Sequence, residues 1–150
     1  MTQDVDLVID NEAARGKLSE LLASFENSDF LFDESAVRDG VHDHRMFQLL
    51  DTQESLKLDV YPRELIPGEL NRSESREVFD GLHLPVASLP DAAVSKLIWV
   101  SKGSHKNRRD IRKIAGRATA LQVQVINSLA DGLGLTELLA EILAESDEIE

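Results

Sequence analysis

The chain has 150 residues, of which 42% are apolar and 29% charged, and these proportions suit one compact domain and exclude disordered or fibrous proteins. Sixteen basic and 28 acidic side chains give a net charge of -12, which opposes unguided binding to duplex DNA or to an anionic membrane and favours small molecules or proteins as partners. The chain has no cysteine, so disulfides, thiolate metal sites and cysteine nucleophiles are excluded.

The first predicted element is a strand over residues 4–9, where the letters DVDLVI alternate in polarity. This alternation puts Asp4 and Asp6 on one face and aliphatic side chains on the other. A helix is predicted over 11–25, with Asn11 as its N-cap and apolar residues at helical spacing. A strand followed by a helix is typical of the start of an α/β or α+β unit.

Short elements and a hairpin are expected next. A short strand is predicted over 30–32, and Asp33 is expected to cap a short helix that Gly40 ends. The runs 45–50 and 55–61 read as two strands joined by a polar turn, which predicts a β-hairpin.

The second strand of this hairpin carries a carboxylate. Asp59 shares its face with Lys57 and Tyr61, opposite a row of aliphatic side chains. A loop is predicted over 62–75 because proline, glycine and polar residues accumulate there.

A second hairpin is predicted from two further strands, 76–79 and 82–86, which an Asp-Gly dipeptide joins. From residue 88 the pattern becomes helical, and Ser88 has the spacing to Asp91 of a capping box. Four helices are predicted, from 88 to Gly103 and then over about 106–118, 120–131 and 135–145. The whole therefore reads as an α+β layout, a single domain over 1–150 with a strand-rich part at about 1–87 and C-terminal helices at about 88–146.

Two acidic residues close together form the first group of side chains that could act in binding or catalysis. Asp4 and Asp6 lie two residues apart on one strand face, with their Cα atoms about 6–7 Å apart. Hard oxygen donors held in this way favour Mg²⁺, and Asp59 would join them if its strand were the neighbour. The alternative is structural, namely that each acid simply faces water.

Basic residues form the second group of side chains that could act in binding or catalysis. Residues 102–117 hold seven basic and one acidic side chain, a local charge of +6. Such a concentration can guide a polyphosphate to one site, because arginine forks match phosphate geometry. The alternative is a solvated helix face with ordinary ion pairs. Lys96 falls on the polar side of the preceding predicted helix, where a single lysine is normally just exposed.

Three stretches together resemble a known family. They are T-x-D-V-D-L-V-I at 2–9, L-K-L-D-V-Y at 56–61, and L-P-V-A-S-L-P-D-A-A-V-S-K-L-I-W at 84–99 followed by R-R-D-I-R at 108–112. The chain resembles bacterial nucleotidyltransferase-like proteins of the DNA polymerase beta superfamily, near the abortive-infection toxin type. The resemblance implies a minimal nucleotidyltransferase fold, with a mixed β-sheet packed on helices and a C-terminal helical cluster.

The resemblance also implies roles for particular residues. In this superfamily the paired acids and a later strand acid hold Mg²⁺ for transfer of a nucleotide from a nucleoside triphosphate, and by position these are Asp4, Asp6 and Asp59. In the toxin-like branch a lysine and an Arg-Asp pair belong to the same cleft, and they map to Lys96, Arg109 and Asp110. We expect Lys96 to contact phosphate and Asp110 to orient a basic or hydroxyl partner.

The chain departs from the family pattern in one respect. The family normally has a glycine-rich or Gly-Ser turn before the paired acids, which cradles the triphosphate, and here only three residues precede Asp4. Two interpretations follow: an upstream segment is missing because the start was assigned too late, or the phosphate cradle is lost. In the second case the fold would serve as a protein-binding scaffold, since a sheet lacking one strand exposes an edge that invites dimerisation.

The leading functional hypothesis is therefore Mg²⁺-dependent binding of a nucleoside triphosphate, with nucleotide transfer to an RNA end, a protein or a small molecule, within a toxin–antitoxin pair. The alternative is a catalytically inactive scaffold that acts as a homodimer or with an antitoxin-like partner. A third hypothesis is an RNA-binding module that uses residues 102–117. Short apolar runs and a polar N-terminus predict no membrane span and no secretory signal, and hence a cytoplasmic protein.

Overall fold

The computed structural model describes residues 3–146. The chain divides into two compact units, Met1–Leu65 and Ile66–Glu150. The boundary expected from sequence, at about residue 87, falls inside the second unit, so the second hairpin groups with the helices. The single domain over 1–150 remains a prediction.

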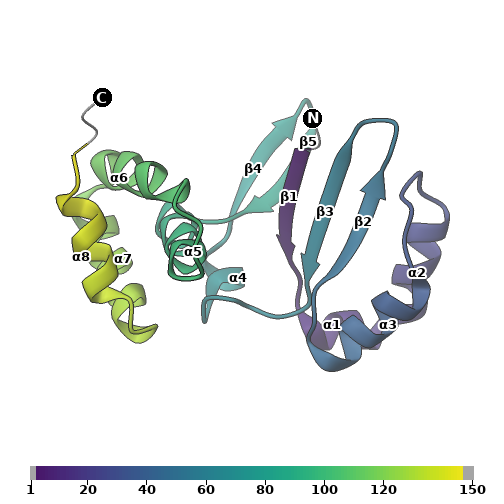
Figure 1. The fold of residues 1–150 in the computed structure, drawn as a ribbon. Coiled ribbons are helices and arrows are strands. Elements are labelled where there is room, and N and C mark those ends of the chain that lie inside the picture. Colours follow the sequence, from purple (N-terminus) through teal and green to yellow (C-terminus); the bar gives the residue numbers. More distant parts are fainter. Residues whose placement is uncertain (1–2, 147–150) are drawn as a thin grey trace. The chain divides into compact units, whose positions relative to one another are not determined.

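A three-stranded mixed sheet forms the centre of the first unit (Figure 1). Its strands are β1 (Gln3–Val8), β2 (Phe47–Asp51) and β3 (Leu56–Tyr61), in the order β1-β3-β2. Strand β1 runs parallel to β3, and β2 pairs antiparallel with β3. The strand predicted over 4–9 and the hairpin predicted over 45–61 are confirmed to within two residues.

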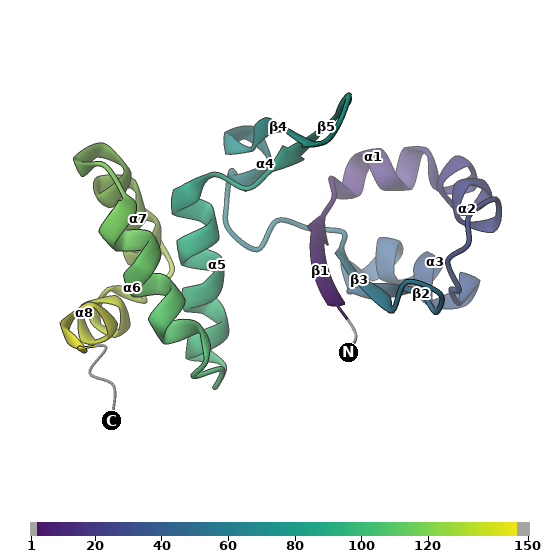
Figure 2. The same ribbon diagram turned by 90° about the horizontal axis from the view of Figure 1, so that it is seen from above.

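Three helices share a core with this sheet: α1 (Asn11–Gly16), α2 (Leu18–Glu26) and α3 (Glu34–Asp43). Figure 2 shows α1 and α2 to one side of the strands. Alternation along β2 and β3 turns their apolar side chains toward the helices, where they are buried. The buried residues of this core are Ala14, Leu22, Val37, Val41, Phe47, Leu49 and Val60. The opposite face of the sheet carries the polar side chains of β1 and β3.

The helix predicted over 11–25 is two helices, because the backbone leaves the helical range at Lys17, with φ -124° and ψ 28°. Asp10 is the N-cap, since its carboxylate accepts the backbone N–H of Ala13 at 3.2 Å. The prediction of Asn11 as the cap is therefore wrong. The Asn11 side chain instead donates from Nδ2 to the carbonyl of Val41 at 2.8 Å and so ties α1 to α3.

Asp33 caps α3 as predicted, through the backbone N–H of Ala36 at 3.1 Å. The predicted end at Gly40 is wrong, because the helix continues to Asp43 and stops at His44, which has a left-handed φ of 58°. Gly40 is needed for packing instead: a Cβ there would lie 2.7 Å from the carbonyl oxygen of Arg45. The short strand predicted over 30–32 is a single bridge between Leu31 and Leu50.

The second unit opens with α4 (Glu69–Arg72), a short helix inside the region predicted as a loop. The hairpin of β4 (Glu74–Phe79) and β5 (Leu82–Val86) follows, confirming the predicted turn. Gly81 has a φ of +79°, a conformation that suits glycine at this turn.

Four helices complete the unit: α5 (Leu89–Ser101), α6 (Asn107–Arg117), α7 (Ala120–Gly132) and α8 (Thr136–Ala144) (Figures 1 and 2). All four were predicted from helical spacing. They bury a second core, which consists of Ile66, Ala93, Val94, Leu97, Val100, Ile111, Ile126, Ala130, Leu139 and Ile142. The fold class is α+β, as predicted. Within the described part of the chain, the helices are too short or too polar to cross a membrane.

Candidate functional site

The three predicted acids come together on the polar face of the first sheet. The parallel register of β1 and β3 sets Asp6 opposite Asp59 and Asp4 opposite Lys57. Side chains at i and i+2 of a strand share a face, and neighbouring strands lie about 4.8 Å apart. We call Asp4, Asp6 and Asp59 the acid face. The predicted condition for this cluster, that the strand of Asp59 neighbours that of Asp4 and Asp6, is met.

Repulsion and partial burial act on the acid face. Burial raises the pKa of the Asp6 carboxyl, the negative charges of Asp59 and then Asp4 raise it further, and Lys57 opposes them. The pKa of the Tyr61 phenol is also raised, first by burial and then by Asp6 and Asp59. This face therefore concentrates negative charge and favours the binding of a cation or a proton.

Two side chains from the same sheet hold the acids. Lys57 Nζ lies 3.7 Å from Asp4 Oδ1 and 3.9 Å from Asp59 Oδ2. Gln48, on β2, donates from Nε2 to Asp59 Oδ1 at 3.0 Å. The Asp59 side chain is only 15% exposed, whereas that of Asp4 is 61% exposed. Asp59 is thus fixed in position, and Asp4 faces water.

Whether a magnesium ion fits the acid face depends on how many of its ligands must be protein oxygens. Among residues 3–146, no group of three or more His, Cys, Asp or Glu residues is arranged to hold a metal ion. Mg²⁺ in proteins is usually held by one or two carboxylates together with waters and substrate phosphates, and not by an all-protein cage. Asp6 and Asp59 are two such hard donors on adjacent strands. The acid face therefore fits a magnesium ion that shares its coordination with phosphate, and does not form a closed metal site.

An apolar groove of about 520 Å³ lies along β2. It is lined by Leu31, Phe32, Asp33, Ala36, Met46, Phe47, Gln48 and Leu50. Gln48 both lines this groove and donates to Asp59, so the groove adjoins the acid face.

The other predicted site residues lie in the second unit. Lys96 on α5 reaches Asp110 on α6, with Nζ 3.2 Å from Oδ2 and the two side chains 35% and 48% exposed. Arg109 is exposed on α6, and no ion pair from it is present within the described residues. The structure thus brings Lys96 and Asp110 together in one unit and the three acids together in the other. The single cleft expected to hold all of them remains a prediction.

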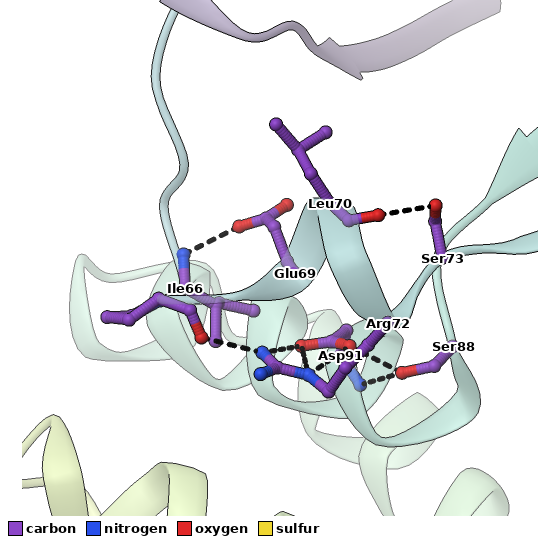
Figure 3. A network of polar contacts seen from close by, with 8 residues as sticks. Ile66, Glu69, Leu70, Arg72, Ser73, Ser88 and Asp91 are labelled. Atoms are coloured by element: carbon purple, nitrogen blue, oxygen red, sulfur yellow. Dashed lines mark hydrogen bonds and ion pairs between the residues drawn. The ribbon is translucent and has the colours of Figure 1, made fainter.

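A buried network that the sequence indicated only in part joins α4 to the start of α5 (Figure 3). Arg72 donates to the Asp91 carboxylate from Nε at 2.9 Å and from Nη2 at 2.7 Å. Ser88 donates from Oγ to the same carboxylate at 2.5 Å and accepts the backbone N–H of Asp91 at 3.2 Å. The Asp91 side chain is 1% exposed, so its charge is matched almost entirely by these donors.

Part of this network could have been found from the sequence. The Ser88-x-x-Asp91 spacing predicts a capping box, and the structure confirms Ser88 as the N-cap, because its Oγ accepts the backbone N–H of Asp91. The Asp91 carboxylate accepts the Ser88 hydroxyl, whereas in a capping box it would accept the backbone N–H of Ser88. Arg72, 19 residues before Asp91, had no signal because it fell in the predicted loop. The sequence placed Lys57 on the same strand face as Asp59 but indicated no function for it. The contact of Gln48 with Asp59 could be inferred only from the register of β2 against β3.

No family model matches the chain, and a comparison with curated proteins finds no match either. The likeness to nucleotidyltransferases therefore rests on the motifs at residues 2–9, 56–61, 84–99 and 108–112.

Proposed function

We propose that the chain is a Mg²⁺-dependent, nucleoside-triphosphate-binding protein of the nucleotidyltransferase type, and that its α+β structure is a minimal nucleotidyltransferase fold. It would transfer a nucleotide to an RNA end, a protein or a small molecule, as a component of a toxin–antitoxin pair. The observation that carries the proposal is the pairing of Asp6 with Asp59 on parallel neighbouring strands, with Asp4 on the same face. Carboxylates gathered at this density are typical of a site for a divalent cation.

The chain's own residues would have distinct tasks. A bound magnesium ion supplies neutralisation of the triphosphate and of the pyrophosphate that leaves. Asp6 and Asp59 would provide the protein oxygens, and Lys57 balances Asp4 and Asp59 when no cation is present. The apolar groove beside Gln48 offers a surface to a nucleoside ring.

Lys96, Arg109 and Asp110 would serve the phosphates. Lys96 would contact a phosphate oxygen, and Arg109 is a second cation on the neighbouring helix. Asp110 holds the Lys96 ammonium at 3.2 Å and so orients it. These roles follow the family resemblance and the ion pair observed in the second unit.

Thermal unfolding with Mg²⁺ and each of the four common nucleoside triphosphates tests the proposal. A ligand that binds only the folded state stabilises it by about 2.7 kcal/mol at one hundred times its Kd, so the melting temperature should rise when both components are present. Asp6→Asn and Asp59→Asn should abolish the rise. Asp29→Asn, at an exposed acid of the same unit, is the matched control and should keep it. A melting temperature that no triphosphate raises, or a rise that survives both site substitutions, would contradict the proposal.

The scaffold alternative is favoured by a different observation, the outer edge of the sheet. Among the described residues β1 pairs only with β3, and Val5 and Leu7 on β1 are 40% and 38% exposed. An unpaired strand edge with apolar side chains can pair with a second chain. We therefore consider a homodimer, or a complex with an antitoxin-like partner, formed along β1.

Light scattering after size-exclusion chromatography tests this second candidate. It predicts a dimer that Val5→Lys dissociates and that Leu121→Lys, at an exposed position on α7, leaves intact. A monomer at a protein concentration of about 100 μM would rule out a stable homodimer, since such interfaces give Kd values well below that concentration. Nucleotide-dependent melting distinguishes the two candidates, because an inactive scaffold predicts none.

A further inference from the structure

Four exposed cations lie along one side of α6. Lys106, Arg109, Lys113 and Arg117 are separated by three, four and four residues, the spacing that keeps side chains on the same side of an α-helix. Lys106 precedes the helix but already has helical backbone angles, with φ -60° and ψ -23°. We call these four residues the basic stripe. At 1.5 Å per residue it extends for about 16 Å.

The other cations of this segment have structural tasks. Arg108 pairs with Glu141 and Glu145 of the α8 region, and Arg112 pairs with Glu145 at 2.7 Å. These pairs fasten α6 to the end of α8. Lys102 lies over the ring of Trp99, at 5.1 Å from its centroid.

The basic stripe has no such partner. Within residues 3–146, no side-chain hydrogen bond or ion pair involves any of its four members, and all four are exposed. Four like charges along one line repel one another, and within the described residues none of them forms an ion pair. The acid nearest to them along α6, Asp110, is paired with Lys96. An arrangement of this kind gains free energy from a partner that brings several negative charges in a row.

The chemistry of the stripe favours a nucleic-acid backbone over a protein. The apolar side of α6 is used in the core, where Ile111 is buried and Ile114 packs against it. Protein interfaces have a desolvated apolar centre, and the four members of the stripe are all charged. Phosphate contacts need only Lys and Arg, and arginine forks match phosphate oxygens.

The acidity of the whole chain does not prevent such binding. Residues 66–150 contain ten basic and 13 acidic side chains, a net charge of -3. Residues 1–65 contain six basic and 15 acidic side chains, a net charge of -9. Exposed charges are screened beyond about 8 Å at physiological ionic strength. The local field at the stripe is therefore set mainly by the charges of its own segment, residues 106–117, which holds six basic side chains and one acidic side chain.

We propose that the basic stripe binds the phosphate backbone of single-stranded nucleic acid without reading the base sequence. Helix α6 has no aromatic residue on which bases could stack, so the contacts are with phosphates only. This inference goes beyond the proposed nucleotidyl transfer, because it requires neither the acid face nor a triphosphate. Its test is done without Mg²⁺ and without nucleotide, so the two proposals can fail separately.

Fluorescence anisotropy of a labelled 15-nucleotide oligouridylate with the full chain tests the inference. Three to four phosphate contacts on a single strand predict a slope of log K against log salt of about -2 to -3, or about 20- to 50-fold weaker binding at 200 mM than at 50 mM salt. The triple variant Arg109→Gln, Lys113→Gln, Arg117→Gln should bind at least about tenfold more weakly, with a slope near about -0.7. A deoxyoligonucleotide of equal length should bind similarly, because phosphates are read and sugars are not.

A matched control removes three charges elsewhere. Arg38→Gln, Arg45→Gln and Arg76→Gln change exposed arginines that already pair with neighbouring carboxylates, and this variant should bind like the unmodified chain. The charge-preserving variant Arg109→Lys, Arg117→Lys should also retain binding. If the triple variant unfolds, the single variants Arg109→Gln and Lys113→Gln replace it, each with an expected loss of about threefold.

Three results would overturn the inference. The first is no binding of the oligouridylate at 50 mM salt, and the second is an equal loss in the control variant. The third is that a polyglutamate of equal charge displaces the oligouridylate at the same or lower concentration, which would assign the stripe to an acidic protein.

Discussion

Asp6 and Asp59 lie directly opposite each other on the parallel strands β1 and β3, so two carboxylates share one small area of the sheet. Like charges in this arrangement disfavour the folded state, and Lys57 offsets them in part with a positive charge close by. Carboxylates placed in this way are more frequent at functional sites than elsewhere. The proposed function and the pH-dependent prediction below therefore both rest on this pair of carboxylates.

Removal of the Asp6 charge should stabilise the chain at neutral pH. Because the pKa of Asp6 is raised in the folded state, the folded chain binds its proton more tightly than the unfolded chain does. The favourable contribution of protonated Asp6 is complete below the ordinary pKa of 3.8 and is lost as the pH rises through the higher folded value. Asp6→Asn should thus gain about 0.2–1 kcal/mol at pH 7, and the gain should vanish below about pH 3.8.

Melting temperatures followed by circular dichroism between pH 3 and pH 8 measure this difference. Asp29→Asn, at an exposed acid, should show no comparable gain at pH 7. An Asp6→Asn variant that is less stable than the unmodified chain at pH 7 would contradict the proposed repulsion.

The buried Arg72–Asp91 pair should be costly to break from one side. Arg72→Met leaves the Asp91 carboxylate, which is 1% exposed, with little besides Ser88 to balance it, and we expect a loss of about 3–5 kcal/mol. Arg76→Met is the matched control, since its pair with Glu74 is exposed and should contribute at most about 1 kcal/mol. Urea unfolding of the two variants provides the comparison, and similar losses would show that the network contributes no more than a surface pair.

The Lys96–Asp110 pair should matter more for ligand binding than for stability. Both side chains are partly exposed, so Lys96→Met should cost only about 0.2–1 kcal/mol in the free energy of unfolding. If Lys96 contacts phosphate as proposed, the same variant should lose most of the triphosphate-dependent rise in melting temperature. Asp110→Asn should weaken that rise less, because the lysine is retained. An unchanged rise in Lys96→Met would remove Lys96 from the proposed site.

Two helical glycines should respond oppositely to alanine. Gly40→Ala would bring a Cβ within 2.7 Å of the Arg45 carbonyl oxygen and 3.1 Å of the Phe47 ring, so we expect a loss of about 1–3 kcal/mol from overpacking. Gly116→Ala meets no atom within 4 Å and should gain about 0.5–1 kcal/mol from helix propensity. Thermal unfolding of both variants checks the signs, and a stabilising Gly40→Ala would show that the end of α3 can shift.

Features that depend on neighbours along the chain were predictable. Period-two alternation placed Asp4 and Asp6 on one strand face, and the Ser88-x-x-Asp91 spacing located the start of α5. Both patterns act over two to four residues, so the sequence contains all the information they need. The α+β class followed from the same local signals.

Features that depend on residues distant in the chain were decided by the tertiary structure. The neighbour of β1 is β3, about 50 residues later, and only that pairing sets Asp59 opposite Asp6. Gly40 lies inside α3, where the missing Cβ leaves room for the Arg45 carbonyl and the Phe47 ring, and the local signal for a helix end does not include this close packing.

The same distinction between local and distant signals explains why the place of Asp91 at a helix start could be predicted and its ion pair with Arg72 could not. A carboxylate at a helix start is a local signal, but its partner is chosen by which side chain is buried beside it, 19 residues away. Local hydrogen-bonding and alternation patterns are therefore determined by the sequence on its own. The pairing of charges is decided when the core forms, because burial removes the water that would otherwise solvate each charge separately.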